Sequence, residues 1–424
     1  MSFTSLGLTP PLLRAIAEQG FELPSPIQAQ SIPAALRGED VLACAQTGSG
    51  KTAAYALPLM QALLSQPAQK PPRRTQALVL VPTRELAIQV VEFLRTLADC
   101  VALPPRVALL FGGVSINPQL MGLRGGAEIV VATPGRLLDV IEHNALSLCN
   151  VQTLVLDEAD RLLDLGFAEE LARVLALLPV QRQQLLFSAT FAPAVQELAQ
   201  RLLKPDALRI TPQNPADDPA LDIAQRAIAV DAPQRTQLLR HLIVSEGWPQ
   251  VLVFVATQYA TELVAHKLER AGLRAAPLHG ELSQGARSAA LAAFKAGELQ
   301  VLVATDVAAR GLHIARLPVV VNYDLPRAAA DYTHRIGRTG RAGESGLAVS
   351  FVSAATEAHW RMIEKRCKLP RTPREQIEGF EPTEVATPEQ AVGGVKSSTR
   401  KSKKDKLREA QAAAAAAADA IPKR

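Results

Sequence analysis

The chain has 424 residues, of which 48% are apolar and 21% are charged. This length allows two or three domains, and the composition excludes a wholly disordered protein. No apolar run reaches the roughly 18 residues that a membrane span requires, and residues 1–7 lack the charged and then apolar pattern of a secretion signal. Aromatic residues make up only 4%, which argues against binding of nucleic acid mainly by base stacking. We therefore expect a cytoplasmic protein with no membrane partner.

The positive charge lies at the end of the chain. Of the net +5, residues 396–424 contribute nine Lys/Arg against three Asp/Glu, a net of +6, so residues 1–395 sum to −1. Because Lys and Ser dominate residues 396–408 and alanine fills 412–418, we expect 376–424 to be a basic, mostly disordered tail. A transient helix over 405–420 is the alternative. Such a basic run is typical of a non-specific RNA or membrane-surface tether, and the motifs described below favour RNA.

Four cysteines are widely spaced along the chain, with no CxxC pair and no histidine at metal-ligand spacing: Cys44, Cys100, Cys149 and Cys367. This pattern predicts small reduced side chains in a reducing compartment rather than a disulfide framework or a zinc site. The sequence has no coiled-coil heptads either, so we expect a monomer.

Short apolar runs alternate with amphipathic segments in the first half of the chain. Runs that lack polar alternation are typical of strands buried on both faces of a parallel sheet. They lie at residues 41–45, 77–81, 107–110, 129–132, 153–156 and 184–187. Between them, residues 85–97 and 169–178 have helical spacing. This succession predicts an open α/β sheet that binds ligands at the carboxyl ends of its strands.

A second α/β region follows a proline-rich segment. Residues 211–219 contain three prolines and little to bury, so we expect a linker at 211–222. Further apolar runs lie at residues 226–230, 251–255, 301–304, 319–322 and 347–352. The predicted organisation is an N-terminal segment (1–30), a first domain (31–210), the linker, a second domain (223–375) and the tail.

A phosphate-binding loop lies between the first predicted strand and a helix. Residues 45–52, AQTGSGKT, fit the GxxxxGK[ST] pattern except that Ala45 replaces the first glycine. Glycine at 48 and 50 lets backbone N–H groups surround phosphate oxygens. We expect Lys51 to reach the β- and γ-phosphates and Thr52 to bind Mg²⁺. The other residues of the predicted nucleotide loop are Gln46, Thr47, Gly48, Ser49 and Gly50.

Residues 157–160, Asp-Glu-Ala-Asp, come directly after the apolar run 154–156. A carboxylate at the end of a buried strand beside a phosphate loop is well placed to hold Mg²⁺. We expect Asp157 to hold the ion largely through water, and Glu158 to orient and deprotonate an attacking water. Alone, such a run more often marks a solvated helix start, but beside the loop it predicts nucleotide hydrolysis.

These motifs belong to an ordered set. The first half also contains GFELPSPIQ (20–28), PTRELA (82–87), TPGR (133–136) and SAT (188–190), and the second contains FVAT (254–257), SQGAR (283–287), ATDVAARG (304–311) and HRIGRTGR (334–341). Over roughly residues 1–375 the chain resembles the DEAD-box ATP-dependent RNA helicases. The opening MSFTSLGL and the short basic tail are most similar to the bacterial RhlE-type branch. The resemblance implies two tandem RecA-like domains, the first of which binds ATP.

The resemblance also assigns an adenine site. Gln28 is expected to make paired hydrogen bonds with the adenine edge, because an amide offers both a donor and an acceptor. Phe21 is expected to stack on the ring, and Phe3 to brace this motif by packing. Without the family context, a solvent-facing amide and a core phenylalanine would be the ordinary interpretations.

Five residues are expected to sense the γ-phosphate. Arg338 and Arg341 would reach it from the second domain, since a guanidinium matches phosphate oxygens. His334 would relay its state to Ser188 and Thr190. Salt bridges on an exposed helix face, and a structural histidine, are the respective alternatives.

The chain departs from the family pattern at His313. Family members usually have an aspartate there, which contacts the ribose across the closed cleft, whereas His313 has an uncertain charge near pH 7. The strength of coupling between ATP and RNA is therefore in question at this position.

The resemblance implies RNA contacts with the sugar–phosphate backbone, which carry no sequence information. The helix start after TPGR favours a phosphate. For Thr83, Thr133 and Thr305, ordinary helix capping is the alternative. The expected RNA-binding residues are Pro82, Thr83, Arg84, Gly113, Thr133, Gly135, Arg136, Thr257, Gln284, Arg287 and Thr305.

The implied function is an RNA-dependent ATPase with ATP and Mg²⁺ as cofactors. Closure of the two domains would unwind short RNA duplexes locally or remodel RNA–protein complexes. An ATP-gated RNA clamp or assembly platform with little unwinding is the alternative, and the Gln motif disfavours a DNA-translocating helicase. Ribosome-assembly and RNA-decay proteins stay open as partners.

Overall fold

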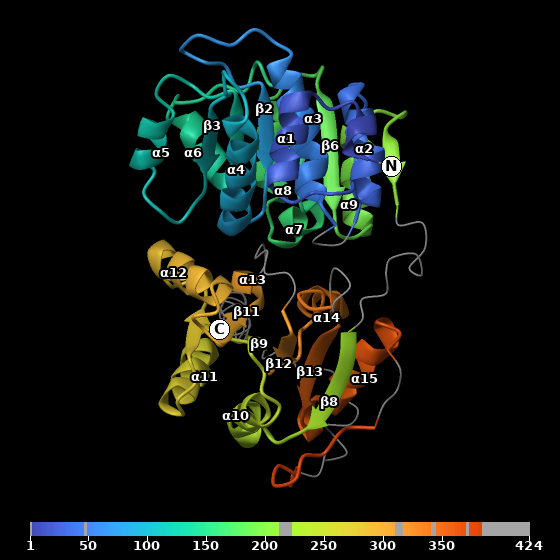
Figure 1. The fold of residues 1–424 in the computed structure, drawn as a ribbon, viewed down its shortest axis with the longest axis vertical. Coiled ribbons are helices and arrows are strands. Elements are labelled where there is room, and N and C mark those ends of the chain that lie inside the picture. The colour runs from blue at the N-terminus through green and yellow to red at the C-terminus, as the bar shows by residue number, and fades with distance from the viewer. Residues whose placement is uncertain are drawn as a thin grey trace, which may run out of the picture.

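The computed structural model describes residues 2–45, 49–211, 223–309, 317–340, 345–369 and 373–383. Within these ranges it has two α/β domains, drawn one above the other in Figure 1. The predicted linker lies almost wholly outside the described residues, and so does the predicted tail from residue 384 onward.

The first domain is built on a seven-stranded sheet of order β3-β4-β2-β5-β6-β1-β7, in which every strand pair is parallel. Its strands are β1 (Val41–Cys44), β2 (Ala77–Leu80), β3 (Val107–Leu110), β4 (Ile129–Ala132), β5 (Thr153–Leu156), β6 (Gln183–Ser188) and β7 (Leu208–Ile210). Its helices are α1 (Pro10–Glu18), α2 (Pro26–Leu36), α3 (Lys51–Leu64), α4 (Arg84–Asp99), α5 (Asn117–Gly122), α6 (Pro134–Glu142), α7 (Ala159–Asp164), α8 (Ala168–Ala176) and α9 (Pro193–Leu202).

Successive strand residues in this sheet point to opposite faces, and both faces are covered. Val41 and Ala43 join the core beneath α1 to α4, whereas Leu42 joins the core beneath α6 to α9. Because both faces are buried, every position of a central strand must be apolar, which explains the uninterrupted runs in the sequence.

The second domain is built on a six-stranded parallel sheet of order β10-β11-β9-β12-β13-β8. Its strands are β8 (Ile223–Ala229), β9 (Val251–Val255), β10 (Ala275–Leu278), β11 (Val301–Thr305), β12 (Val319–Asn322) and β13 (Gly346–Val352). Its helices are α10 (Arg235–Ser245), α11 (Gln258–Arg270), α12 (Gln284–Lys295), α13 (Asp306–Ala309), α14 (Ala329–Ile336) and α15 (Glu357–Arg366). Short 3₁₀ turns lie at Phe3–Leu6, Ala232–Gln234 and Ala354–Thr356.

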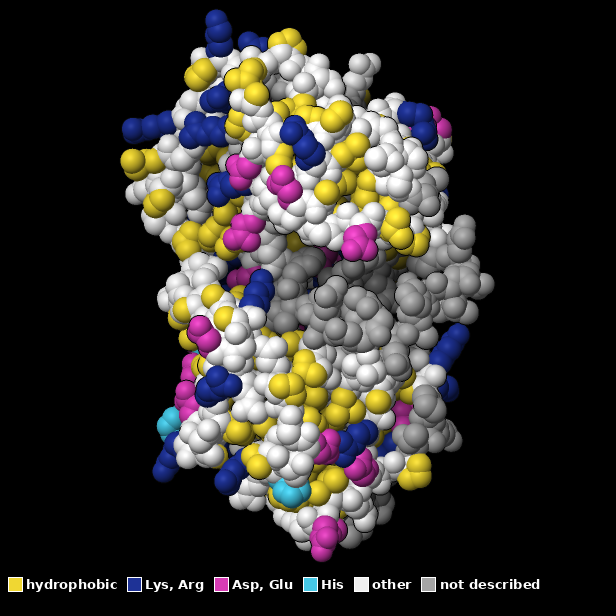
Figure 2. Space-filling model, in the orientation of Figure 1, with side chains coloured by type: hydrophobic (Ala, Val, Ile, Leu, Met, Phe, Trp, Pro, Cys, Tyr) yellow, Lys and Arg dark blue, Asp and Glu magenta, His cyan; other side chains and the backbone are white. Residues whose placement is uncertain are grey.

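On the face drawn in Figure 2, basic side chains are interspersed with acidic and hydrophobic ones over both domains. No helix in the described ranges is long and apolar enough to cross a membrane.

Residues 373–383, which include the beginning of the predicted tail, pack against the second domain. The Glu375 backbone forms a parallel bridge with Ile228 of β8, and its carboxylate pairs with Arg226 at 2.7 Å. Ile377 and Phe380 pack against the domain core, and Thr383 donates its backbone N–H and its hydroxyl to Asp231. We call residues 373–383 the strap. It covers the β8 edge of the sheet, so fewer backbone groups of that strand are left unpaired.

We predict that Phe380→Ala destabilises the second domain by about 1–2 kcal/mol. This is less than the 3–5 kcal/mol typical of a fully buried phenylalanine, because the Phe380 ring is only partly covered. The chain's two tryptophans, Trp248 and Trp360, both lie in this domain, so urea unfolding followed by tryptophan fluorescence reports on it selectively. Glu378→Ala, at an exposed position of the strap, is the control. Equal midpoints for the two variants would mean that packing of Phe380 contributes nothing to the stability of the domain.

Candidate nucleotide and RNA site

Sheet topology separates the predicted motifs into two groups at the same edge of the first domain. Strands β1, β5 and β6 are neighbours, and their carboxyl ends lead into the phosphate loop, residues 157–160 and residues 188–190. Strands β2, β3 and β4 are also neighbours, and they lead into the predicted RNA-binding segments. One group can therefore act on a nucleotide while the other holds a second ligand alongside it.

The end of the phosphate loop requires glycine. Gly50 has a φ of 89°, and a Cβ atom there would overlap the amide nitrogen of Gln28. Helix α3 begins at the next residue, and Lys51, which is buried, donates to the Ala45 carbonyl at 2.9 Å. Gln46, Thr47 and Gly48 lie outside the described residues.

Gln28 links the N-terminal segment to the phosphate loop. Its Oε1 accepts from the Ser25 backbone N–H at 2.9 Å, and its Nε2 donates to the Gly50 carbonyl at 3.1 Å. Ser25 also donates its hydroxyl to the Ser49 carbonyl at 2.7 Å. The amide still has one N–H and one lone pair for an adenine edge.

Phe21 lines a cavity of about 310 Å³. Its ring centroid is 6.2 Å from that of Phe3, in an edge-to-face contact, and 6.1 Å from that of Phe93. Lys51, Thr52, Asp157 and Glu158 line the same cavity. A cavity lined by both aromatic rings and charged side chains suits a ligand that has both a ring and phosphates.

The two acidic residues that begin the DEAD sequence are buried beside this cavity. Asp157 accepts from the Tyr55 hydroxyl at 2.8 Å and from the Glu158 backbone N–H at 2.9 Å. Glu158 has a left-handed backbone, with φ 49° and ψ 52°, immediately before α7. Burial raises the pKa of both carboxyl groups, and nearby Lys51 opposes that rise.

Residues 188–190 connect to the last acid of the DEAD sequence. Thr190 donates its hydroxyl to Asp160 at 3.2 Å, and Ser188 donates its hydroxyl to the Thr190 carbonyl at 2.9 Å. These bonds join the segments that follow the carboxyl ends of β5 and β6.

The second domain supplies cationic groups to this region. Arg338, His334 and Arg335 line a small cavity at the domain interface together with Glu158 and Arg161 of the first domain. Burial lowers the pKa of the Arg338 guanidinium, and Glu158 opposes that effect. The pKa of His334 is lowered to about 4, first by burial and then by Arg161, so the ring is neutral near pH 7. Arg341 and His313 lie outside the described residues.

Arg335 fixes the helix that carries these groups. It forms a bidentate pair with Asp306 at 2.6 and 2.7 Å, and its guanidinium lies 4.9 Å from the Phe254 ring centroid. These contacts join α14 to the carboxyl ends of β9 and β11.

The predicted RNA residues of the first domain form one cluster. Thr83 caps α4 by accepting from the Leu86 N–H at 3.3 Å, whereas Thr133 makes no side-chain cap. Arg84 packs so closely on Gly113 that a Cβ atom there would overlap it, and Arg136 donates to the Val114 carbonyl at 2.7 Å. Pro82 and Gly135 adjoin these helix starts.

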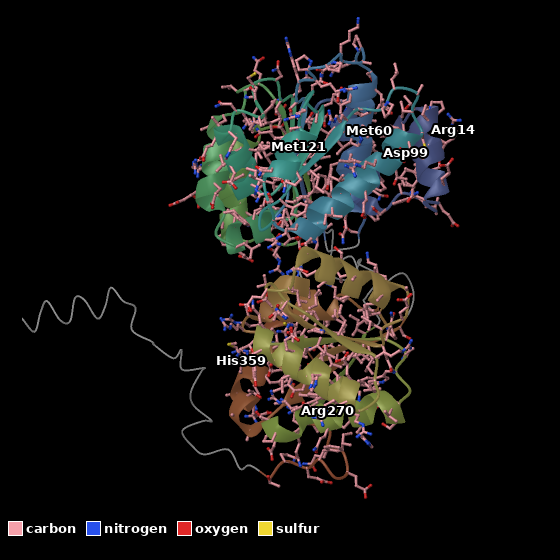
Figure 3. All side chains as sticks on the ribbon, turned by 90° about the vertical axis from the view of Figure 1, so that its left-hand side faces the viewer. Arg14, Met60, Asp99, Met121, Arg270 and His359 are labelled. Carbon is pink, nitrogen blue, oxygen red and sulfur yellow. The ribbon has the colours of Figure 1, made fainter. Side chains whose placement is uncertain are left out.

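The predicted RNA residues of the second domain differ in exposure. Thr257 is exposed and caps α11 by accepting from the Ala260 N–H at 3.1 Å. Gln284 opens α12 and has a buried Oε1 without a hydrogen-bond partner in the described structure. Thr305 ends β11 and accepts weakly from Ala308 at 3.4 Å. Arg287 is buried and pairs with Glu85 of the first domain at 2.5 Å. Figures 1 and 3 both show α12 beneath α4, in agreement with this ion pair.

Sequence reasoning missed several residues at this site. Tyr55 lies one helical turn after Lys51, so the spacing on α3 could have placed it on the same helix face as Lys51. Its bond with Asp157, 102 positions away, has no local signal. Arg161 directly follows the DEAD sequence, but its partner Asp331 is 170 positions away. No local pattern signals a pair of that separation.

Two parallel sheets, each covered by helices, with a phosphate loop after β1 of the first, define a tandem RecA-like nucleoside triphosphatase. The DEAD/DEAH box helicase model matches residues 25–198, and the helicase conserved C-terminal domain model matches residues 234–343. The ATP-dependent rRNA helicase rrp3 of Sclerotinia sclerotiorum is 41% identical over 386 residues, which are 90% of this chain and 78% of that protein. The chain belongs to the DEAD-box family of ATP-dependent RNA helicases.

Other relatives agree with this assignment. The ATP-dependent RNA helicase DeaD of Escherichia coli is 42% identical over 369 residues, which cover 87% of this chain and 57% of that protein. Saccharomyces cerevisiae Dbp5 bound to RNA and ADP BeF3 has a TM-score of 0.78 and 32% identity, and the match covers 88% of this chain and 95% of that one. The chain is thus an enzyme that uses ATP and binds RNA.

We predict that His334 makes the second domain sensitive to acid. Its folded-state pKa of about 4 lies below the ordinary value of 6.5, so the unfolded chain binds more protons between these values. The resulting stability is present above pH 6.5 and is lost as the pH falls toward 4. When the pH falls from 7 to 5, the free energy of unfolding of the unmodified chain should therefore decrease by about 1–2 kcal/mol more than that of His334→Gln. Urea unfolding followed by tryptophan fluorescence measures both decreases. Equal losses in both proteins would contradict the burial of a neutral ring.

Proposed function

We propose that the chain is an RNA-dependent ATPase that unwinds short RNA duplexes locally, or remodels RNA–protein complexes, by ATP-gated closure of its two domains. The supporting observation is that Glu158 of the first domain and Arg338 of the second, both buried, line one cavity. A carboxylate can activate an attacking water, and a guanidinium can stabilise charge on the phosphate that is attacked. The two domains together therefore offer both groups that phosphate hydrolysis uses.

In this proposal the first domain binds the nucleotide. Phe21 and Gln28 hold the adenine, while the amides of residues 45–50 and the Lys51 ammonium hold the phosphates. Thr52 and Asp157 offer a hydroxyl and a carboxylate, the hard oxygen ligands that suit Mg²⁺ held mostly through water and phosphate. When bound, the ion neutralises phosphate charge.

Glu158 then orients the attacking water and takes its proton. Burial raises the pKa of this carboxyl group, which makes its ionised form a stronger base than an exposed glutamate. Arg338 and Arg341 stabilise charge on the γ-phosphate, an effect worth on the order of 10³–10⁵ in rate for an arginine finger. His334 is neutral and senses closure through Asp160, Ser188 and Thr190.

RNA binds along the carboxyl ends of β2, β3 and β4 and continues onto those of β9, β10 and β11. We include the eleven backbone-contacting residues named above in this surface. The proposed domain division, at the linker 211–222, is supported by two separate sheets, one on each side of it. The rRNA helicase name of the rrp3 relative supports ribosome-assembly factors as partners, and RNA-decay proteins stay an alternative.

We predict that single-stranded RNA stimulates ATP hydrolysis and that single-stranded DNA of the same sequence does not. Steady-state ATPase rates with each strand measure this directly. Glu158→Gln is expected to lose turnover while still binding ATP and labelled RNA, because only the base is removed. Normal turnover by Glu158→Gln would disprove the base assignment, and a rate indifferent to RNA would disprove the gate.

A strand-displacement assay separates unwinding from clamping. ATP-dependent release of a short duplex strand supports the helicase, whereas ATP-dependent retention without release supports the clamp.

We predict that deleting residues 384–424 weakens RNA binding and flattens its salt dependence. The slope of the logarithm of the RNA-binding constant against the logarithm of the salt concentration should become less negative. The expected change is about 0.7 for each RNA phosphate that the tail no longer neutralises. Ending the chain after Thr383 keeps the strap, so the urea midpoint reported by tryptophan should not change. An unchanged slope would show that the basic tail takes no part in binding.

A further inference from the structure

A second charged contact crosses the domain interface beside the catalytic cavity. Arg161 of α7 and Asp331 of α14 approach to 3.3 Å between Nη1 and Oδ1. The Arg161 side chain is 8% exposed and that of Asp331 is 19% exposed. Because both side chains are largely removed from water while the domains are in contact, their mutual attraction is screened less than that of an exposed ion pair.

Arg161 has another carboxylate partner within its own helix. Its Nη1 lies 3.7 Å from Oδ2 of Asp164, three residues later, and the Asp164 side chain is 63% exposed. This partner belongs to the first domain, so it stays near Arg161 whether or not the second domain is docked. The same guanidinium can therefore be paired in both states.

The positions of the two partners connect this contact with catalysis. Glu158 is the N-cap of α7, so Arg161 lies in the first turn after the proposed base. Asp331 and His334 are three residues apart on α14 and share one face of the helix. Arg338 follows the end of the same helix. A bond between Arg161 and Asp331 thus fixes the helix that precedes Arg338 against the helix that follows Glu158.

We propose that Arg161 is a positioning residue that gains Asp331 as a second carboxylate partner beside Asp164 when the domains close, and that this added ion pair contributes to the coupling between ATP and RNA. The inference rests on the proposed function, because it requires the gated closure described above. Asp164 opposes closure in two ways: it stabilises Arg161 in the open state and repels Asp331 in the closed one. The domains therefore close only when bound ATP and RNA add to the ion pair.

The test measures coupling rather than turnover alone. The affinity for a fluorescent single-stranded RNA is measured by anisotropy with and without a non-hydrolysable ATP analogue, and the ratio of the two affinities is the coupling. We expect Arg161→Asp and Asp331→Arg each to reduce this ratio about tenfold. The double variant, which restores the pair with its charges exchanged, should recover most of the loss.

Asp164→Asn is the matched control, because it removes the competing carboxylate from the same helix turn. We expect it to raise the coupling ratio, a gain that misfolding cannot produce. A charge reversal without rescue in the double variant, or a reduced ratio in Asp164→Asn, would overturn the inference. If the unmodified chain shows no coupling at all, the proposed function itself fails, and the two failures are thereby distinguished.

Discussion

Burial of charge at the boundary between two domains is the constraint on which this structure depends. Glu158 and Arg338 are buried around one cavity between the domains, and Lys51 and Asp157 are buried beside Glu158 in the first domain. An ionised group in such a place is costly unless it is compensated, so each domain presents charges that the other, or a bound phosphate, must balance. The pKa shifts reflect this cost. Burial is the largest influence on the pKa values of Asp157, Glu158 and Arg338, and a nearby opposite charge partly offsets it.

The fold delivers these charges by a simple rule of parallel sheets. In the first domain every strand ends at the same edge, so residues from β1, β5 and β6 meet although β1 is more than a hundred positions from the other two. The neighbouring strands β2, β3 and β4 end beside them, which places a second binding surface next to the first. The shared sheet therefore holds the two surfaces side by side within the first domain.

Much of this architecture could be predicted from the sequence, because a strand buried on both faces must be apolar throughout. The ranges 107–110, 129–132, 153–156, 251–255 and 319–322 coincide with β3, β4, β5, β9 and β12. Two strands have no such signal. β7 has three residues and includes Arg209, and β10 reads Ala-Ala-Pro-Leu at a sheet edge, where proline is tolerated. Most of the strap falls within the predicted tail, because its sequence has no strand or helix pattern. Its contacts with β8, with Asp231 and with the domain core are evident only in the structure.

The candidate site was harder to predict where one residue has two roles. Thr83 and Thr257 cap helices, and Gln28 caps α2 while it holds the Gly50 carbonyl. A cap orients the first turn of a helix, and the free N–H groups of that turn face the position where a phosphate would lie. The capping hydrogen bond therefore orients the binding surface and is compatible with phosphate binding there. Arg287 is different, because its guanidinium is already paired with Glu85 across the interface. An RNA phosphate would have to share that cation with a carboxylate, so the contribution of Arg287 to RNA binding depends on whether the domains are closed.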